Sequence, residues 1–380
     1  MIYYYGVTQQ GTYHIEHDLV CQDAHFCKVI NDHFAIAAVA DGLGSEKYSD
    51  VASKIASEKS VQYCSENINE NGNLDDIPEV IKKSFEVALG EIYAVADAEK
   101  QERDQYDTTL SVVVFLNGTV YFGNSGDSGI VVLNKDGTYD PLTEQQRDEN
   151  GYVFPLCFGE EKWVFGKKEN VGSVLLATDG MLETLFPFLL KNEPVSIYVA
   201  LAHFLMNEES LHFADSADGD VQQKMDAFVA SISGKQVNDD KTILVMLDTA
   251  IICEKQSPEY YAAPDWASLK KKHDEAFRRA AYPHLYKDEE NMAEEKNEED
   301  TSVTNNGIEN QVNEVTEVLD NENQPTVSSE SEPEMNESNS VEEKNDAVEN
   351  SSEPVEKENT NLFSKLKSKA GSIFKKNTEQ

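Results

Sequence analysis

The chain has 380 residues, with 71 acidic against 32 basic side chains and a formal net charge of -39. A balance this acidic, with no basic stripe in its aromatic-rich part, excludes nucleic acid as an expected partner. There is neither a secretory signal pattern nor an apolar run of the roughly 18 residues needed to span a membrane, so we expect a cytoplasmic protein. Five cysteines without CxxC spacing favour free thiols.

Composition divides the chain into four segments. Residues 1–250 contain most of the aromatic residues and are long enough for one folded domain, and 251–287 predict a helical extension. Residues 288–360 hold 24 acidic and 3 basic residues and no Phe, Tyr or Trp. Such a segment cannot bury enough apolar surface to offset its chain entropy, so we expect a disordered acidic linker. Residues 361–380 predict a basic amphipathic helix.

The first third of the chain alternates between strand and helix patterns. Short strands are predicted at 3–8 and 24–30, and the unbroken apolar run Phe34–Ala40 predicts a buried strand. Apolar residues at helical spacing then predict helices over 49–68 and 77–98. Both apolar stripes indicate packing surfaces rather than binding sites.

A meander follows the second helix. Residues 109–116 and 119–124 flank an Asn-Gly turn, and a third strand at 130–133 follows a glycine corner. Residues 144–166 are irregular and predict a flap over the acidic residues. Further strands are expected at 173–178 and 242–247, with a helix near 194–206. Because helices must cover sheet faces, the predicted fold is α+β, a four-layer αββα sandwich of two antiparallel sheets flanked by helices.

Four of the predicted strands have acidic residues at one end. Asp41 and Asp179 each precede a glycine after an apolar run, Asp127 lies in the glycine corner, and Asp239-Asp240 precede the last strand. A single Asp-Gly is typical of a strand that ends in a turn, but the recurrence indicates one shared site. Carboxylates gathered there would repel one another by several kcal/mol unless a cation lay between them. Oxygen ligands favour Mg²⁺ or Mn²⁺ over zinc.

The acidic motifs also form an ordered series over residues 1 to about 250. This series resembles the metal-dependent PPM, or PP2C-type, serine/threonine protein phosphatases in a compact bacterial form. The motifs that carry the resemblance are Gln22-Asp23, Asp41-Gly42-Leu43-Gly44, Gly126-Asp127-Ser128-Gly129, Thr178-Asp179-Gly180 and Asn238-Asp239-Asp240-Lys241-Thr242.

The resemblance implies a two-metal hydrolase. Its two Mn²⁺ or Mg²⁺ ions would activate water for in-line attack on a phosphoryl group without a covalent intermediate. Asp41 would bridge the ions, and Asp23 would complete the metal site by orienting the attacking water. The other implied ligands are the Gly42 carbonyl, Asp179 and Asp239, with Asp127 at a third ion.

The sequence departs from the family pattern around the phosphate-binding position. Asp18 stands where the family has an arginine that grips the substrate phosphate, and Gln22 replaces a frequent glutamate. Gly129 ends a corner that often ends in arginine, and Leu43 stands where some members have histidine. Arg147 in the predicted flap is a candidate replacement for the phosphate-binding arginine, with an exposed loop arginine as the plainer alternative.

Three histidines lie close to Asp23 in sequence. One of His14, His17 and His25 is a candidate general acid for the leaving oxygen. Ordinary surface histidines are the alternative that we expect.

We expect a monomeric phosphatase that acts on phosphorylated proteins and opposes a Ser/Thr kinase. The alternative is a pseudophosphatase, a phosphoprotein-binding scaffold whose tail recruits partners, and a small-molecule phosphatase is a third hypothesis. Retention of Asp41, Asp179 and Asp239 favours the enzyme, because a scaffold has no physical need for mutually repelling acids. The basic segment 361–380 predicts peripheral binding to an anionic membrane, with an acidic protein groove or the chain's own domain as alternatives.

Overall fold

The computed structural model describes residues 1–214 and 219–286. The predicted acidic linker 288–360 and the basic helix 361–380 lie outside the described residues. Residues Met1–Lys271 form one compact unit, and the two sheets and the helices that cover them belong to it.

Two five-stranded sheets form the centre of this unit, and every pair of neighbouring strands is antiparallel. The β3 sheet has the order β2 (Asp23–Asn31), β3 (Phe34–Asp41), β4 (Leu110–Leu116), β5 (Thr119–Ser125) and β8 (Val164–Lys168). The β10 sheet has the order β1 (Ile2–Gln9), β10 (Lys241–Asp248), β9 (Val171–Ala177), β6 (Gly129–Asn134) and β7 (Tyr139–Pro141).

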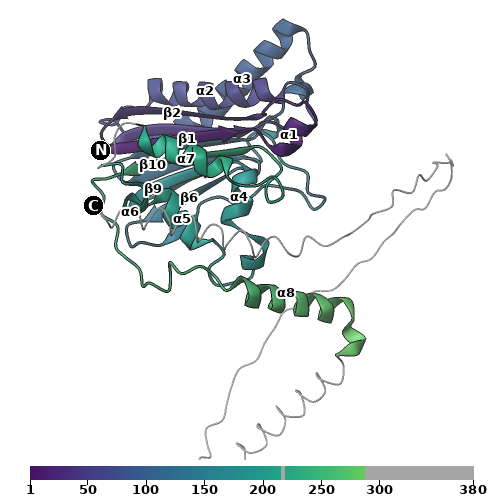
Figure 1. Cartoon of the computed structure of the whole chain (residues 1–380). Helices are drawn as coiled ribbons and strands as arrows, with labels where there is room; N and C mark the ends of the chain where they lie inside the picture. The colour runs from purple at the N-terminus through teal and green to yellow at the C-terminus, as the bar shows by residue number, and fades with distance from the viewer. Residues whose placement is uncertain (215–218, 287–380) are drawn as a thin grey trace, which may run out of the picture. The chain divides into compact units, whose positions relative to one another are not determined.

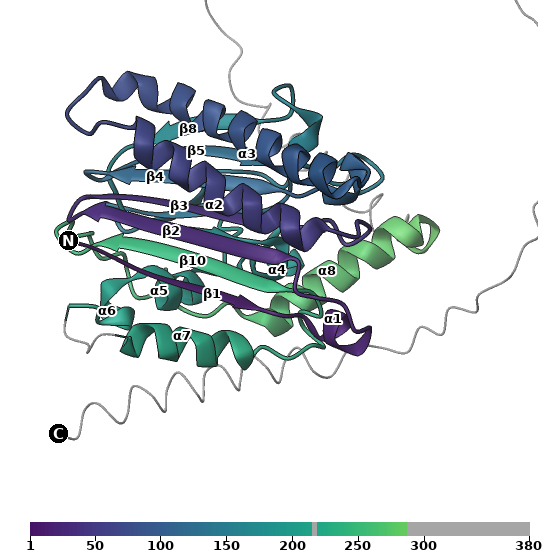
Figure 2. The same ribbon diagram turned by 90° about the horizontal axis from the view of Figure 1, so that it is seen from above.

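Helices cover the outer face of each sheet, so the predicted α+β sandwich is confirmed (Figure 1). The long helices α2 (Ser49–Asn67) and α3 (Ile77–Glu99) run side by side across the β3 sheet (Figure 2). The β10 sheet is covered by α4 (Asp179–Leu185), α5 (Val199–Met206), α6 (Glu208–Leu211) and α7 (Asp220–Ala230). The remaining elements are α1 (Thr12–Glu16), α8 (Trp266–Ala281) and 3₁₀ turns at Leu74–Asp76, Arg103–Tyr106, Leu156–Phe158, Phe188–Leu190 and Pro283–Leu285.

Strand β3 is apolar throughout because both of its faces are buried. Phe34, Ile36 and Ala38 pack into the core beneath α2 and α3. Ala35 and Val39 belong to the core between the two sheets. Since side chains alternate along a strand, Asp41 continues the face that points between the sheets. The residue pattern therefore delivers this carboxylate to the end of the inter-sheet core.

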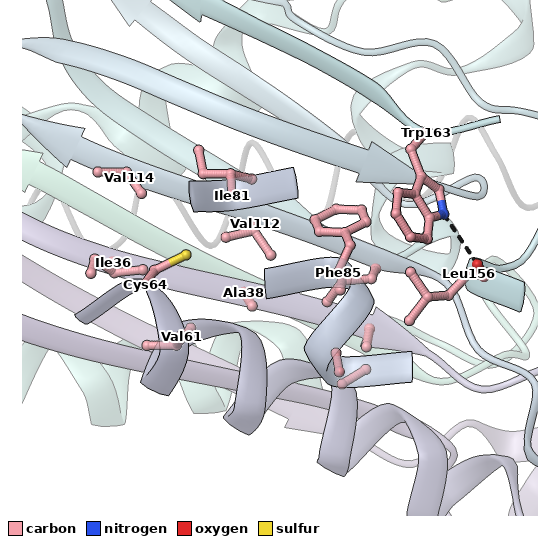
Figure 3. Close-up of a cluster of buried hydrophobic side chains, with 14 of the residues drawn as sticks. Ile36, Ala38, Val61, Cys64, Ile81, Phe85, Val112, Val114, Leu156 and Trp163 are labelled. Carbon is pink, nitrogen blue, oxygen red and sulfur yellow. Dashed lines mark hydrogen bonds between the residues drawn. The ribbon is translucent and has the colours of Figure 1, made fainter. Parts of the chain in front are cut away.

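The core under the helices is closed by aromatic residues from the far edge of the β3 sheet (Figure 3). Phe85 of α3 packs edge-on against Trp163 and Phe165, with both ring centroids 5.4 Å away. The Trp163 indole Nε1 donates to the Leu156 carbonyl oxygen at 3.1 Å. These contacts hold the segment before β8 against the body of the domain.

The end of the predicted flap 144–166 is wrong, because residues 164–166 belong to edge strand β8, which pairs with β5. The Phe165 ring packs on Phe85, and this burial favours strand pairing over an open loop. The irregular segment is therefore confined to residues 142–163. The hydrophobic pattern did not predict helix α1, which follows β1, or helix α7, which precedes β10.

Candidate active site

Carboxylates gather at one end of both sheets because antiparallel strands alternately begin and end there. Strand β2 begins at Asp23, and β3 ends at Asp41. Strand β9 ends two residues before Asp179, and β10 begins directly after Asp240. In the β3 sheet Asp23 and Asp41 are register partners, so their side chains lie on the same face.

Hydroxyl groups connect these acids across the two sheets. Thr178 Oγ1 donates to Asp23 Oδ2 at 2.7 Å and accepts from the Thr242 backbone N–H at 3.1 Å. The bond from Thr178 fixes one carboxylate oxygen of Asp23, and the Asp23 residue is buried.

Asp41 is fixed through its backbone. Its N–H donates to Thr109 Oγ1 at 2.9 Å, and its carbonyl oxygen accepts from the Thr109 N–H at 2.8 Å. Thr109 Oγ1 also bonds Ser128 Oγ at 2.9 Å, which ties the glycine corner to the end of β3. Gly126 in that corner has φ +101°, and an added Cβ would lie 2.5 Å from a methyl carbon of Thr109. The close approach therefore requires glycine, and it places the next residue, Asp127, beside the cluster.

The electrostatics show that the acids share one environment. Burial raises the pKa of Asp41 well above its ordinary value, and Asp23, Asp179, Asp127 and Asp239 each raise it further. Burial followed by the charge of Asp240 likewise raises the pKa of Asp23. Each of the predicted carboxylates therefore lies close enough to Asp41 to disfavour its charged form.

The two outer acids of the cluster have raised pKa values for the same reasons. The pKa of Asp127 rises to about 6 through burial and the neighbouring Asp179, against the opposing effect of Arg147. The pKa of Asp239 is also raised, first by burial and then by the charge of Asp179.

One arginine enters the cluster from the irregular segment. Arg147 Nη2 lies 2.5 Å from Asp127 Oδ2 and 2.9 Å from Asp179 Oδ2. The Arg147 side chain is 39% exposed, whereas that of Asp127 is 3% exposed. Arg147 is partly exposed, as expected of a loop arginine, but its guanidinium group also pairs with two acids of the site.

Asp240 organises the backbone around the cluster. Its Oδ1 accepts from the Gly11 N–H at 2.6 Å, and its Oδ2 accepts from the Gln22 N–H at 2.6 Å. His14 Nδ1 lies 2.9 Å from the same Oδ2, and the His14 ring is buried. The expectation of ordinary surface histidines is therefore wrong for His14, because α1 turns its ring inward against Asp240.

Helix α4 starts close to the beginning of β10. A Cβ at Gly180 would lie 2.2 Å from the Asp240 carbonyl oxygen, so only glycine permits this approach. Asp179 is thereby brought near Asp239. A cavity of about 350 Å³ borders helix α4, which begins at Asp179, and its walls include Gly129, Leu182 and Glu183.

The chemistry of the donor set fits hard divalent cations. Buried and half-buried carboxylates offer a cation only oxygen ligands, which Mg²⁺ and Mn²⁺ prefer. A second set in the described part of the chain, His14, Asp239 and Asp240, has ligand-type atoms within 4.8 Å of one another. Because both Asp240 oxygens already accept backbone hydrogen bonds, we interpret that set as a structural brace.

Sequence reasoning identified the acids but missed their supports. The strand-Asp-Gly pattern found Asp41 and Asp179, and the structure brings them together with Asp23, Asp127 and Asp239. The bracing roles of Asp240 and His14 were missed. The signal for Asp240 was present in the doubled acid before β10, whereas His14 depends on a five-residue helix that has no periodicity to detect.

A four-layer sandwich whose sheet ends share a carboxylate cluster defines an α+β protein with a candidate metal centre. The family model for protein phosphatase 2C matches residues 10–230, and the chain belongs to this family. It is therefore a protein serine/threonine phosphatase, and the predicted family resemblance is confirmed. A search of curated proteins gives no match.

Solved structures of bacterial phosphatases are similar in fold. A structure described as a bacterial serine phosphatase is 14% identical, with a TM-score of 0.48. The match covers 67% of this chain and 100% of that one. Stp1 from Staphylococcus aureus is 15% identical with a TM-score of 0.46, covering 65% of this chain and 95% of its own. PstP/Ppp from Mycobacterium tuberculosis is 16% identical with a TM-score of 0.44, covering 67% and 99%.

Among the described residues, none of the helices has the length and apolar character needed to cross a membrane. All five cysteines carry free thiols, as predicted.

Proposed function

We propose that the chain hydrolyses phosphoserine and phosphothreonine in proteins with two divalent cations held by the carboxylate cluster. Asp41 would hold both ions, and Asp179, Asp239 and the Gly42 carbonyl would be further ligands. The observation that supports this most strongly is the position of Asp41, which is disfavoured as an anion by burial and by four neighbouring carboxylates. Cations between these groups would remove the repulsion.

When bound, Mn²⁺ or Mg²⁺ would supply an acidified water and neutralise charge on the phosphoryl oxygens. The chain's own residues position the reactants. The Thr178 hydroxyl holds Asp23 through its Oδ2 atom, and the Asp23 carboxylate would orient the attacking water. The free cysteines take no part in this scheme.

Asp127 and Arg147 complete the proposed site. Asp127 would be a ligand for a third ion, and the guanidinium group of Arg147 would bind a phosphoryl oxygen of the substrate. The cavity beside helix α4 offers a place for the polypeptide that flanks the phosphorylated residue. Such substrates would be the products of a Ser/Thr kinase, which this enzyme would oppose.

The test is Mn²⁺-dependent hydrolysis of p-nitrophenyl phosphate and of a phosphothreonine peptide by the full chain. Asp41→Asn and Asp179→Asn are each expected to lower kcat/KM at least about a hundredfold. Loss of a residue that only hydrogen-bonds to a metal ligand typically lowers metal affinity or activity about 10–100-fold, and loss of a ligand itself should cost at least as much. Asp75→Asn is the matched control, since Asp75 is exposed on a remote 3₁₀ turn.

Two results would contradict the proposal. Absence of activity with every divalent metal, in a folded protein, would favour the scaffold. Turnover that neither substitution affects would place the reaction elsewhere.

A further inference from the structure

We infer that Arg147 is a built-in competitor of the third divalent cation, because its guanidinium group and that ion need the same carboxylate oxygens. The inference rests on the proposed function, since it concerns the outer edge of the same metal site. It adds that the chain itself supplies a cation that must leave before this ion can bind Asp127 and Asp179 together.

The geometry makes the two occupants mutually exclusive. Arg147 Nη2 is within 3 Å of both carboxylates, at 2.5 Å from Asp127 Oδ2 and 2.9 Å from Asp179 Oδ2. A divalent cation bound to those oxygens would lie about 2.0–2.6 Å from each. The Nη2 atom already fills this space, and two positive centres so close would repel each other.

The backbone that carries Arg147 is anchored, so the exchange requires only the side chain to move. Gln146 Oε1 accepts from the Gly126 N–H at 2.8 Å, and the Gln146 N–H donates to the Gly126 carbonyl oxygen at 3.1 Å. Gln146 Nε2 also donates to the Lys162 carbonyl oxygen at 2.9 Å. Arg147 itself pairs with Val153 in an isolated bridge.

The residues after Arg147 form a closed turn. Asp148 Oδ1 accepts from the Asn150 and Tyr152 N–H groups, each at 2.8 Å. The backbone at Arg147 is therefore fixed, and only the side chain can move within its own length.

The charge balance allows the exchange in both directions. One guanidinium group facing two carboxylates leaves a net negative charge. A divalent cation is therefore still attracted to the pair. Because the Arg147 side chain is 39% exposed, it can rotate into solvent without being stranded in the core.

Displacement has a consequence for substrate binding. Once released from Asp127 and Asp179, the guanidinium fork is unpaired and remains at the edge of the site. It is then available for a phosphoryl oxygen, which it recognises by two parallel hydrogen bonds. Binding of the third ion thus prepares Arg147 to bind phosphate.

The experiment counts Mn²⁺ ions on the full chain by calorimetry and by electron paramagnetic resonance of free Mn²⁺, without measuring activity. Arg147→Ala is expected to tighten the weakest class of bound Mn²⁺ roughly five- to tenfold, the range of a partly exposed ion pair. Arg147→Lys is expected to retain most of the competition. Arg103→Ala is the matched control, because Arg103 is an exposed arginine that pairs with Asp97 at 2.7 Å rather than with an acid of the cluster.

A double variant separates competition from a general change in the fold. Asp127→Asn removes a ligand of the weakest class, so adding Arg147→Ala to it should give no tightening. Equal Mn²⁺ affinity in wild type and Arg147→Ala, with tighter ions still bound, would overturn the competition and leave the proposed function intact. A wild-type chain that binds no Mn²⁺ at all would overturn both.

Discussion

Asp239 and Asp240 are adjacent in the chain but have opposite surroundings. The Asp239 side chain is 56% exposed at the edge of the cluster, whereas that of Asp240 is 4% exposed and braced by backbone N–H groups. The contrast in burial separates Asp239, the proposed metal ligand, from Asp240, the structural carboxylate.

Substitution of these neighbours is expected to give opposite results. Asp240→Ala would leave the buried Gly11 and Gln22 N–H groups unpaired and lower the free energy of unfolding by about 2–4 kcal/mol. Asp239→Ala should change stability by less than about 0.5 kcal/mol while it lowers Mn²⁺-dependent activity. Urea unfolding without metal, with activity measured alongside, checks both. Equal loss of stability in the two variants would contradict the assignment of Asp240 as the brace.

Individual site residues were predictable only where the signal is local. An apolar run that ends in Asp-Gly identifies Asp41 and Asp179 because strand and turn are adjacent in sequence. The contact between Arg147 and Asp179 joins residues 32 positions apart through a loop whose path depends on the Gln146 hydrogen bonds. Periodicity carries no information about such a path.

At the scale of elements, helix α2 shows why the spacing of apolar residues predicts only part of a helix's buried face. Its buried residues include Ser53, Ser57 and Ser60, which a hydrophobic stripe does not count. Their hydroxyls donate to backbone carbonyls three residues earlier, at 3.1, 3.1 and 3.2 Å. Because these small side chains hydrogen-bond to their own helix, they can be buried, and their size lets the helix approach the sheet closely.

Helix α3 and strand β8 are joined by the Phe85 ring, which is fully buried. Phe85→Ala is expected to lower the free energy of unfolding by about 3–5 kcal/mol, because it removes the edge-on contacts with Trp163 and Phe165 and leaves a cavity. Phe85→Leu should cost clearly less, since part of the volume is retained. The measurement is urea unfolding followed by tryptophan fluorescence.

Phe188→Ala is the control for Phe85→Ala, because Phe188 is 66% exposed on a separate 3₁₀ turn. It should change the free energy of unfolding by less than about 0.5 kcal/mol. A Phe85→Ala variant as stable as that control would show that β8 does not depend on α3.

At the scale of the whole molecule, the four-layer arrangement was predictable because every sheet face needs a partner. Strand β3 reads as apolar on both faces, which already requires a layer above and below it. The strand order was not predictable in this way, since β8 joins β5 and β1 joins β10 through contacts between distant residues. Yet this order is what places Asp23, Asp41 and Asp239 at one end.

Gathering the acids at that end should make the metal-free fold sensitive to pH. A carboxyl group whose pKa is raised by folding contributes most stability below its ordinary pKa, and that contribution is lost as the pH rises through the raised value. For Asp127 the raised value is about 6, and the pKa values of Asp23 and Asp41 are raised as well. Near neutral pH the cluster should therefore destabilise the metal-free protein.

Asp41→Asn should accordingly stabilise the metal-free chain. At about pH 7.5 in a chelator, the variant is expected to exceed wild type by at least about 1 kcal/mol, because about one unit of pKa shift corresponds to about 1.4 kcal/mol. At about pH 5 the difference should shrink, since wild-type carboxyls then hold protons in the fold. Added Mn²⁺ should reverse the order, because metal binding stabilises the chain that keeps Asp41, the proposed metal ligand. Urea unfolding at both pH values, with and without Mn²⁺, measures all four differences, and a less stable metal-free Asp41→Asn at neutral pH would contradict a cluster held under mutual repulsion.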